Sequence, residues 1–263
     1  MAAPVVLLLL NILRVATLKM TRSFVGDILL VLDQSASIIV EGGATYRNWC
    51  VVLEFAKSVA DAFRISSNRA QVGVIKFNTE ADVVFYLDKY KDNKSLCNAI
   101  VNIDLERGQA NLAAALRTGR WMFRTYNGAR DGVPRILIML TDGTANVEEE
   151  ETEKETTKTK EDGIAIFTVG VGNDVNQDEL EKIASKPEYF FFATDFNDLG
   201  DILEKLLVTI TTTTDAPTNE WVLHAIAHAA TPVKTTSTAE TTWATTTKSR
   251  KTLLSYFLIS YVV

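Results

Sequence analysis

DILLVLDQSAS, residues 27–37, is an apolar run that ends abruptly in oxygen-bearing side chains. Its apolar residues follow one another without alternation, which is typical of a strand covered on both faces. Such strands occur in parallel sheets, where ligands bind at the carboxyl ends of the strands. Asp33, Ser35 and Ser37 stand at that end of the run. The stretch therefore predicts a buried strand with a polar site at its tip.

Five further apolar runs repeat this pattern along the chain. They cover residues 72–77, 83–86, 136–140, 164–169 and 189–192. Most of the stretches between them carry apolar residues at three- and four-residue steps, which is typical of amphipathic helices. Only the runs near 72–77 and 83–86 lie close enough together to form a hairpin. Strands separated by helices predict an α/β fold, a doubly wound and mainly parallel sheet with helices on both faces.

Residues 148–162, EEEETEKETTKTKED, stand where a helix should cover the sheet, yet they contain no apolar residue. Glu150 with Lys154 and Glu155 with Lys158 can pair along a helix, and each pair contributes only a few tenths of a kcal/mol. We therefore expect a solvated or poorly docked helix. The alternative is an acidic patch that binds a basic partner.

Asp142, at the end of the run RILIMLTD, is a second carboxylate at a strand end. If its strand neighbours the strand of Asp33, both carboxylates face one crevice. With the hydroxyls of Ser35 and Ser37 they form an all-oxygen set, which suits a hard cation such as Mg²⁺ or Mn²⁺. Mg²⁺ keeps some of its waters, so a carboxylate of another molecule can replace one. In the alternative interpretation, these side chains only cap the following loop and helix.

Six blocks of the sequence occur in the order found in von Willebrand factor type A domains, which the chain resembles from about residue 26 to 210. The blocks are DILLVLDQSASI, QVGVIKFNTEADVVFYL, RGQANLAAALRTG, PRILIMLTDGTAN, IAIFTVGVG and DELEKIAS. The resemblance implies a six-stranded, Rossmann-like sheet with one antiparallel edge strand, consistent with the hairpin. It also implies a metal-ion-dependent adhesion site made of Asp33, Ser35, Ser37 and Asp142, with a threonine from another loop.

That threonine is absent from this chain. Family members usually have a loop similar to GGGTN, whereas this chain has RGQAN at residues 107–111, with Ala110 in place of the threonine. Water or Asn111 supplies the missing metal ligand, or the ligand is not replaced. In family members that switch, the threonine contacts the metal in the ligand-bound form. The resemblance therefore implies that tight, carboxylate-completed binding is affected more than metal occupancy.

Catalysis and nucleic-acid binding find little support in the sequence. A net charge of −6 disfavours attraction to phosphates. The only two histidines, His224 and His228, have the spacing of a zinc-protease helix without its glutamate, so no histidine serves a Ser-His-Asp arrangement in the globular region. We expect no enzymatic activity. A metal-dependent hydrolase based on Asp33 and Asp142 is the least favoured alternative.

Segments of different composition flank the globular region. Residues 1–22 contain an apolar run typical of a signal peptide, the alternative being initiation at Met20. We expect the globular domain to cover residues 23–210. Residues 211–251 are rich in threonine, which predicts a disordered, extended stalk. Residues 252–263 form an apolar tail too short to span a bilayer. We interpret the tail as a lipid-anchor signal that provides a membrane tether, as a truncated span, or as an arbitrary terminus.

Cys50 and Cys97 are the only cysteines. In an oxidising compartment they can form one disulfide, and the alternative is that both are buried small apolar side chains. Asn93 begins the sequon Asn-Lys-Ser, which suits N-glycosylation of a secreted protein.

These features predict a secreted or surface-tethered adhesion module. We expect its type A domain to present a divalent cation to an acidic residue of an extracellular protein, such as collagen or another matrix protein. Two alternatives stay open. One is a metal-independent structural interaction domain of the extracellular matrix, which Ala110 favours. The other is an intracellular scaffold, if residues 1–22 are not a signal.

Overall fold

The computed structural model describes residues 21–36, 45–143, 145 and 147–213. Nearly all of the expected signal peptide, most of the Thr-rich stalk and the whole apolar tail lie outside this part of the chain. Within it, no helix is both long enough and apolar enough to cross a membrane.

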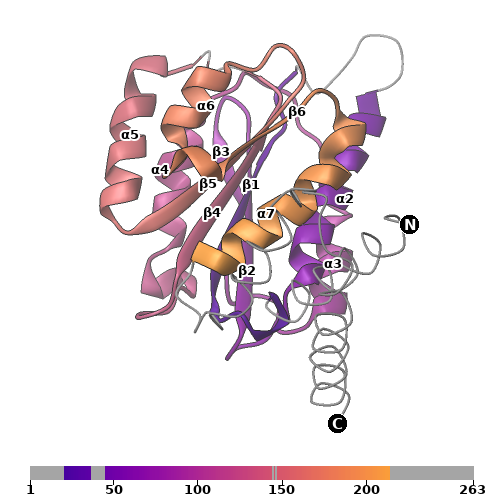
Figure 1. Ribbon diagram of the computed structural model, residues 1–263, viewed down its shortest axis with the longest axis vertical. Helices are drawn as coiled ribbons and strands as arrows, with labels where there is room; N and C mark the ends of the chain where they lie inside the picture. Colours follow the sequence, from indigo (N-terminus) through magenta and orange to yellow (C-terminus); the bar gives the residue numbers. More distant parts are fainter. Residues whose placement is uncertain (1–20, 37–44, 144, 146, 214–263) are drawn as a thin grey trace, which may run out of the picture. The chain divides into compact units, whose positions relative to one another are not determined.

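A six-stranded sheet forms the centre of the domain, in the order β3-β2-β1-β4-β5-β6 (Figure 1). The strands are β1 (Gly26–Asp33), β2 (Ala70–Phe77), β3 (Ala81–Phe85), β4 (Arg135–Thr141), β5 (Ile164–Val171) and β6 (Phe190–Ala193). All neighbouring strands are parallel except β2 and β3, which form the expected antiparallel hairpin at the edge. The predicted fold class is confirmed.

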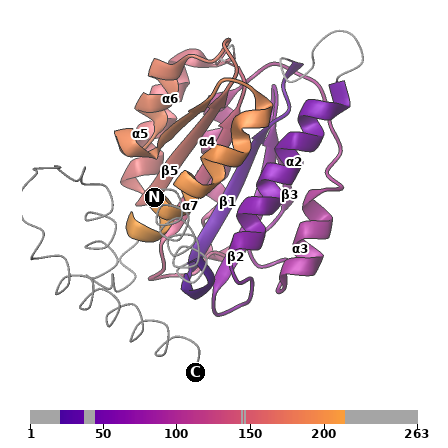
Figure 2. The same ribbon diagram turned by 45° about the vertical axis from the view of Figure 1, so that its right-hand side comes forward.

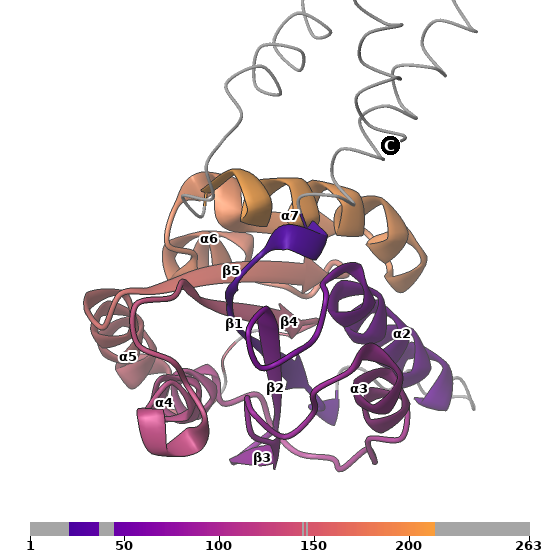
Figure 3. The ribbon, with the colours of Figure 1, turned by 90° about the horizontal axis from the view of Figure 1, so that it is seen from below.

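Helices cover both faces of the sheet (Figures 2 and 3). One face carries α2 (Thr45–Ala62), α3 (Asn93–Ile100) and α7 (Leu199–Thr213). The other carries α4 (Leu112–Met122), α5 (Glu149–Glu161) and α6 (Gln177–Ile183). Three single 3-10 turns complete the described elements: η2 (Thr125–Asn127), η3 (Pro187–Tyr189) and η4 (Phe196–Asp198).

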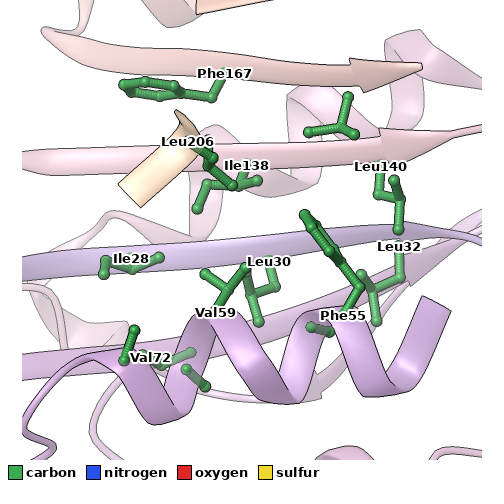
Figure 4. Packing of buried hydrophobic residues seen from close by; sticks show 14 of the residues in the cluster. Ile28, Leu30, Leu32, Phe55, Val59, Val72, Ile138, Leu140, Phe167 and Leu206 are labelled. Atoms are coloured by element: carbon green, nitrogen blue, oxygen red, sulfur yellow. The ribbon is translucent and has the colours of Figure 1, made fainter. Parts of the chain in front are cut away.

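β1 contributes to the cores on both faces of the sheet. Ile28, Leu30 and Leu32 pack toward α2 and α7, as Figure 4 shows. Leu29 and Val31, which alternate with them, pack toward α4. A pleated strand points successive side chains to opposite faces, and all five are at most 2% exposed. The apolar run at residues 28–32 is therefore continuous because both faces of its strand are covered.

α5 is docked on the domain, so the expectation of a solvated or poorly docked helix is wrong. It packs against α4 and β5 and buries one face, which consists of Thr152, Glu155, Thr156 and Thr159. These four residues recur at three- and four-residue steps, and threonine offers a methyl group to an interface. The two ion pairs along α5 join Lys154 to Glu151, rather than to Glu150, and Lys158 to Glu155.

α7 continues into the Thr-rich segment. It ends at Thr213, and Thr211 is buried, with its hydroxyl donating to the carbonyl of Leu207 at 2.9 Å. The first threonines of the expected stalk therefore belong to the last helix of the domain.

Candidate metal centre

Asp33 is the last residue of β1 and is completely buried. Its carboxylate accepts a hydrogen bond from the backbone N–H of Ser35 to Oδ1 at 2.7 Å and another from the hydroxyl of Thr141 to Oδ2 at 2.5 Å. β1 and β4 are parallel neighbours, which brings the end of β4 beside the end of β1. Asp33 is thus held in one orientation by groups from both strands.

Asp142 follows β4 directly and is 7% exposed. Because β1 and β4 end at the same edge of the sheet, Asp33, Ser35 and Asp142 gather there, as the sequence predicted. Ser35 is also buried. Ser37 lies outside the described residues. Two carboxylates and one hydroxyl are therefore placed at the carboxyl edge of the sheet.

Asp33 has no cationic partner among the described residues. The groups that bond its carboxylate are the hydroxyl of Thr141 and the side chain and backbone N–H of Ser35, all of them neutral. Burial raises the pKa of the Asp33 carboxyl above its ordinary value, and the hydrogen bonds from Thr141 and Ser35 oppose this rise. A buried carboxylate without a cation is costly, so the edge of the sheet favours a positive charge.

Ala110 is 2% exposed and carries no side-chain oxygen. Its neighbour Asn111 is the N-cap of α4, and its side-chain oxygen accepts from the backbone N–H of Ala114 at 2.8 Å. The Asn111 amide nitrogen donates to the carbonyl of Thr79 at 3.1 Å. Both ends of the Asn111 carboxamide are therefore engaged in holding α4 and the β2–β3 turn.

The β2–β3 turn holds the loop at residues 107–111. The N–H of Gln109 donates to the hydroxyl of Thr79 at 3.1 Å, and the N–H of Asn111 donates to the carbonyl of Asn78 at 2.9 Å. Gly108 lies so close that a Cβ there would be 2.7 Å from the Cβ of Asn78. The loop is thus fixed by hydrogen bonds to the turn.

Sequence reasoning missed three supporting residues at this edge. Thr141 could have been found, because its hydroxyl stands directly before Asp142 in LTDG. Thr79 gave no sequence signal of its role, since its contacts join segments about thirty residues apart. Gln34 is completely buried, with its side-chain oxygen accepting from the N–H of Glu106 at 2.9 Å. No sequence pattern indicated that Gln34 would hold the loop at Glu106.

No group of three or more histidine, cysteine, aspartate or glutamate side chains is arranged to hold a metal within the described part of the chain. A cation at this edge would therefore rest on two carboxylates, and it would draw further oxygens from hydroxyls and water. Such a donor set fits Mg²⁺ or Mn²⁺, which bind oxygen and retain waters. It does not fit a closed structural zinc site, which takes four protein ligands.

Cys50 and Cys97 are free thiols, so they do not form the disulfide that the sequence allowed. The Sγ of Cys97, on α3, lies 3.9 Å from the Oδ1 of Asp61, near the end of α2. Cys50 stands eleven residues before Asp61 on the same helix, a separation of about 16 Å along its axis. A disulfide needs Cα atoms within about 7 Å of each other. The alternative, in which both cysteines are buried small apolar side chains, is also wrong, because Cys50 is exposed and Cys97 is only partly buried.

Asn93, the expected glycosylation site, joins α3 to the end of α2. Its Nδ2 donates to the carbonyl of Phe63 at 2.8 Å and to Asp61 Oδ1 at 3.3 Å, and its Oδ1 accepts from the N–H of Ile65 at 3.1 Å. A glycan on Nδ2 would replace one of the donated hydrogens. N-glycosylation of Asn93 stays a prediction, and it competes with this contact.

The family model of the von Willebrand factor type A domain matches residues 27–205 of the chain. Matrilin-1 from Gallus gallus is 32% identical over 187 residues, which is 70% of this chain and 36% of that protein. The collagen alpha-1(XII) chain from Notophthalmus viridescens is 29% identical over 203 residues, covering 76% of this chain and 21% of that protein. The chain therefore spans well under half the length of these relatives.

Solved structures of proximal thread matrix protein 1 from the mussel byssus are similar in fold and sequence. One has a TM-score of 0.64 at 26% identity, covering 73% of this chain and 47% of that one. Another is described as having a zinc-occupied MIDAS motif, which is the metal-ion-dependent adhesion site. It has a TM-score of 0.64 at 27% identity and covers 72% of this chain and 46% of that one. The relatives are secreted proteins of extracellular matrices, and the predicted extracellular location is confirmed.

Proposed function

Because the chain belongs to the von Willebrand factor type A domain family, we propose that it is an extracellular adhesion module whose sheet edge binds a divalent cation. Asp33, Ser35 and Asp142 are the proposed protein ligands, with Ser37 as a further hydroxyl. The bound cation would supply a vacant position for an acidic residue of a protein ligand.

The observation that carries this proposal is the environment of Asp33. The carboxylate is fully buried, and it is oriented by Thr141 and Ser35 without a cationic side chain from any described residue. The contrasting aspartate at the other end of β1, Asp27, lies beside Arg130. An external cation would give Asp33 the charge partner that Asp27 already has.

Ala110 should lower the affinity of this site for metal. The oxygen of Asn111 already caps α4, so water is the remaining source for the ligand that a threonine would provide. Zinc in the MIDAS motif of the byssus protein supports a divalent cation at the equivalent edge. We propose Mg²⁺ or Mn²⁺ here, because the donors are oxygens.

The proposed partner is a matrix protein, such as collagen. The support is the kind of relatives the chain has, which are matrilins and collagen chains. We also propose that residues 1–22 are a signal peptide, that residues 211–251 extend from the domain as a stalk, and that the tail at 252–263 provides a tether. Mass measurement of a secreted product tests the signal peptide, and an uncleaved chain would contradict it.

Calorimetric titration of the full chain with Mn²⁺ and Mg²⁺ tests the site. We expect the natural chain to bind weakly and Ala110→Thr, which adds a hydroxyl ligand, to bind at least about tenfold more tightly, a difference of about 1.4 kcal/mol. Asp142→Asn should abolish binding. Asp131→Asn, which removes an 84% exposed carboxylate elsewhere, is the matched control and should bind as the natural chain does.

Failure of both the natural chain and Ala110→Thr to bind would refute the metal site. Binding by Ala110→Thr alone would identify the natural domain as degenerate. It would favour the second candidate function, a metal-independent interaction domain of the matrix. Two observations favour that candidate: Ala110 offers no side-chain oxygen, and both oxygens of Asp33 already accept hydrogen bonds from the protein. Binding to a matrix ligand in the presence of EDTA distinguishes the two.

A further inference from the structure

α5 differs from the other helices in how it is held to the domain. Each of α2, α3, α4, α6 and α7 contributes apolar side chains to one of the two cores, whereas α5 has no apolar residue to contribute. It lies alongside α4 and against β5 (Figures 1 and 3). Regions with few buried apolar contacts open at a lower free energy than the rest of a domain. Among these helices, α5 therefore gains the least from apolar burial when it docks.

Three buried polar atoms of α4 and α5 have no hydrogen-bond partner within the described part of the chain. They are the hydroxyl oxygens of Thr152 and Thr156 and the Nε of Arg120. The two threonines lie one turn apart on the buried face of α5, and Arg120 extends from α4. Burial of an unpaired polar group costs free energy, which water recovers when the contact opens. These three atoms therefore favour separation of the two helices.

α5 begins from a strained backbone position. Glu148, its N-cap, has a φ of 51° and is the one described residue other than glycine with a positive φ. That conformation is unfavourable for a glutamate, and undocking of the helix would release it. α5 is also short, with thirteen residues of which four are threonines. An isolated helix of this length is marginal in water, so we expect α5 to unfold once it leaves α4.

One buried carboxylate provides the main polar contact that keeps α5 docked. Glu155 is 3% exposed, and its Oε2 accepts from the Nη2 of Arg120 on α4 at 2.7 Å. The other polar contacts of described α5 residues and caps with neighbouring elements are exposed: Glu148 with Arg117, Lys160 with the carbonyl of Lys182, and Asp162 with Arg124. Exposed pairs contribute little to stability. The docking of α5 therefore depends mainly on Glu155.

The charge of Glu155 decides whether the α4–α5 contact is attractive. Two titratable groups face it from α4 and three from α5 itself, while β5 has none: Arg117, Arg120, Glu151, Lys154 and Lys158. Burial raises the pKa of Glu155, but the hydrogen bonds from Lys158 and Arg120 outweigh it and lower that pKa. Docking is therefore favoured above the unfolded-state pKa and weakens as pH falls through the folded-state pKa. Protonation also leaves the cations of the contact facing one another without the anion between them.

We propose that α5 opens and unfolds as a separate unit while the sheet and the other helices stay folded, and that acid triggers this opening by neutralising Glu155. In the open form, water hydrates the hydroxyls of Thr152 and Thr156, and the backbone of Glu148 leaves its strained conformation. The helix responds to charge because no apolar side chain holds it in place. This opening uses no metal and does not depend on Asp33.

Hydrogen exchange of the full chain in EDTA, followed by mass spectrometry at urea concentrations below the unfolding transition, tests the separate opening. At pH 7 we expect the amides of α5 to exchange faster than those of β1 and with a much weaker dependence on urea, because a local opening exposes little surface. Glu155→Gln should speed the exchange of α5 about fivefold, since it removes a charged hydrogen-bond acceptor. Glu151→Gln, which removes an exposed carboxylate of the same helix, is the matched control and should exchange as the natural chain does.

The same measurement at lower pH tests the trigger. After correction for the intrinsic exchange rates, the protection of α5 in the natural chain should fall about threefold between pH 7 and about pH 3.5. Glu155→Gln should show no such fall, because its side chain does not titrate. Equal protection of α5 in the natural chain at the two pH values would refute the acid trigger.

Thr156→Val tests the opening from the opposite direction. It replaces an unpaired buried hydroxyl by a methyl group of nearly the same shape, so it should slow the exchange of α5 about threefold. Unchanged or faster exchange would contradict the role given to the unpaired hydroxyls. A urea dependence of α5 as steep as that of β1 would overturn the proposal as a whole, because α5 would then unfold only together with the domain.

Discussion

β1 carries a buried aspartate at each end, and the two differ in what surrounds them. Asp27 accepts from Arg130 through the guanidinium, at 2.7 and 2.9 Å, and through the Arg130 backbone N–H, at 2.7 Å. The same guanidinium donates to the carbonyls of Gly26 and Arg69, both at 2.8 Å. Asp33 has only neutral donors. One carboxylate is therefore paired within the fold, and the other is the one that we propose binds a cation.

Arg130→Ala should strongly destabilise the domain. The substitution leaves Asp27 buried without its cation and removes donors from three backbone carbonyls, and breaking a buried pair in this way costs about 3–5 kcal/mol. Urea unfolding measures the loss. Asp131→Ala, which removes the exposed pair with Arg135, is the matched control and should change stability by less than about 0.5 kcal/mol. Equal effects of the two substitutions would contradict this account.

The α4–α5 contact shows how a helix without apolar residues can dock. Glu155 is 3% exposed, and its carboxylate accepts from Arg120 at 2.7 Å and from Lys158 at 2.8 Å. The Arg117 Nε lies 3.9 Å from it. Thr152, Thr156 and Thr159 make up the rest of the buried face. The contact is thus a polar seam around one buried, fully paired carboxylate.

Glu155→Gln should weaken the domain at neutral pH and change how its stability depends on pH. Burial alone would raise the pKa of Glu155, but the hydrogen bonds from Lys158 and Arg120 outweigh it and lower the pKa below its usual value. Glu155 therefore stabilises the fold above the unfolded-state pKa, and this contribution is lost as pH falls through the lowered folded-state pKa. We expect a loss of about 1–3 kcal/mol at pH 7 that shrinks below about pH 4.5, measured by urea unfolding at several pH values.

Glu151→Gln is the control for that measurement. Glu151 pairs with Lys154 on the exposed side of α5, where solvent screens the interaction. Its substitution should leave stability nearly unchanged at every pH. A constant difference between Glu155→Gln and the natural chain down to pH 3 would show that the Glu155 charge contributes nothing.

The sequence predicted the strands far better than the contacts between distant segments. β1 was evident because its run of apolar residues is continuous, and the hairpin of β2 and β3 because its turn is short. The docking of α5 was not evident, because a search for regularly spaced apolar residues counts threonine as polar although its methyl group packs well. Likewise, Ala110 could be recognised as an absent ligand, whereas the capping by Asn111 and the contacts of Thr79 depend on how loops meet in the folded domain.

At the scale of the domain, the described residues present two different surfaces. The carboxyl edge of the sheet offers the oxygens of Asp33, Ser35 and Asp142, whereas the exposed rings of Tyr86, Trp121 and Tyr126 lie after β3, on α4 and on η2. A cation site needs charge and oxygens, which the rings do not offer. EDTA should therefore affect only an interaction at the carboxyl edge.

Asp33→Asn should make the domain more stable than the natural chain in EDTA and less stable than the natural chain when Mn²⁺ is bound. In EDTA the amide removes a buried charge that lacks a cation, and its oxygen can still accept from Ser35 while Thr141 turns its hydroxyl toward the carbonyl of Gly143, 3.3 Å away. We therefore expect the variant to melt above the natural chain in EDTA. With Mn²⁺ at a hundredfold excess over Kd, the natural chain should gain about 2.7 kcal/mol and the variant nothing, so the order of melting temperatures inverts. Thermal unfolding followed by circular dichroism measures both. An equal gain in the two chains would place the cation elsewhere, because only the natural chain has the Asp33 carboxylate to offer.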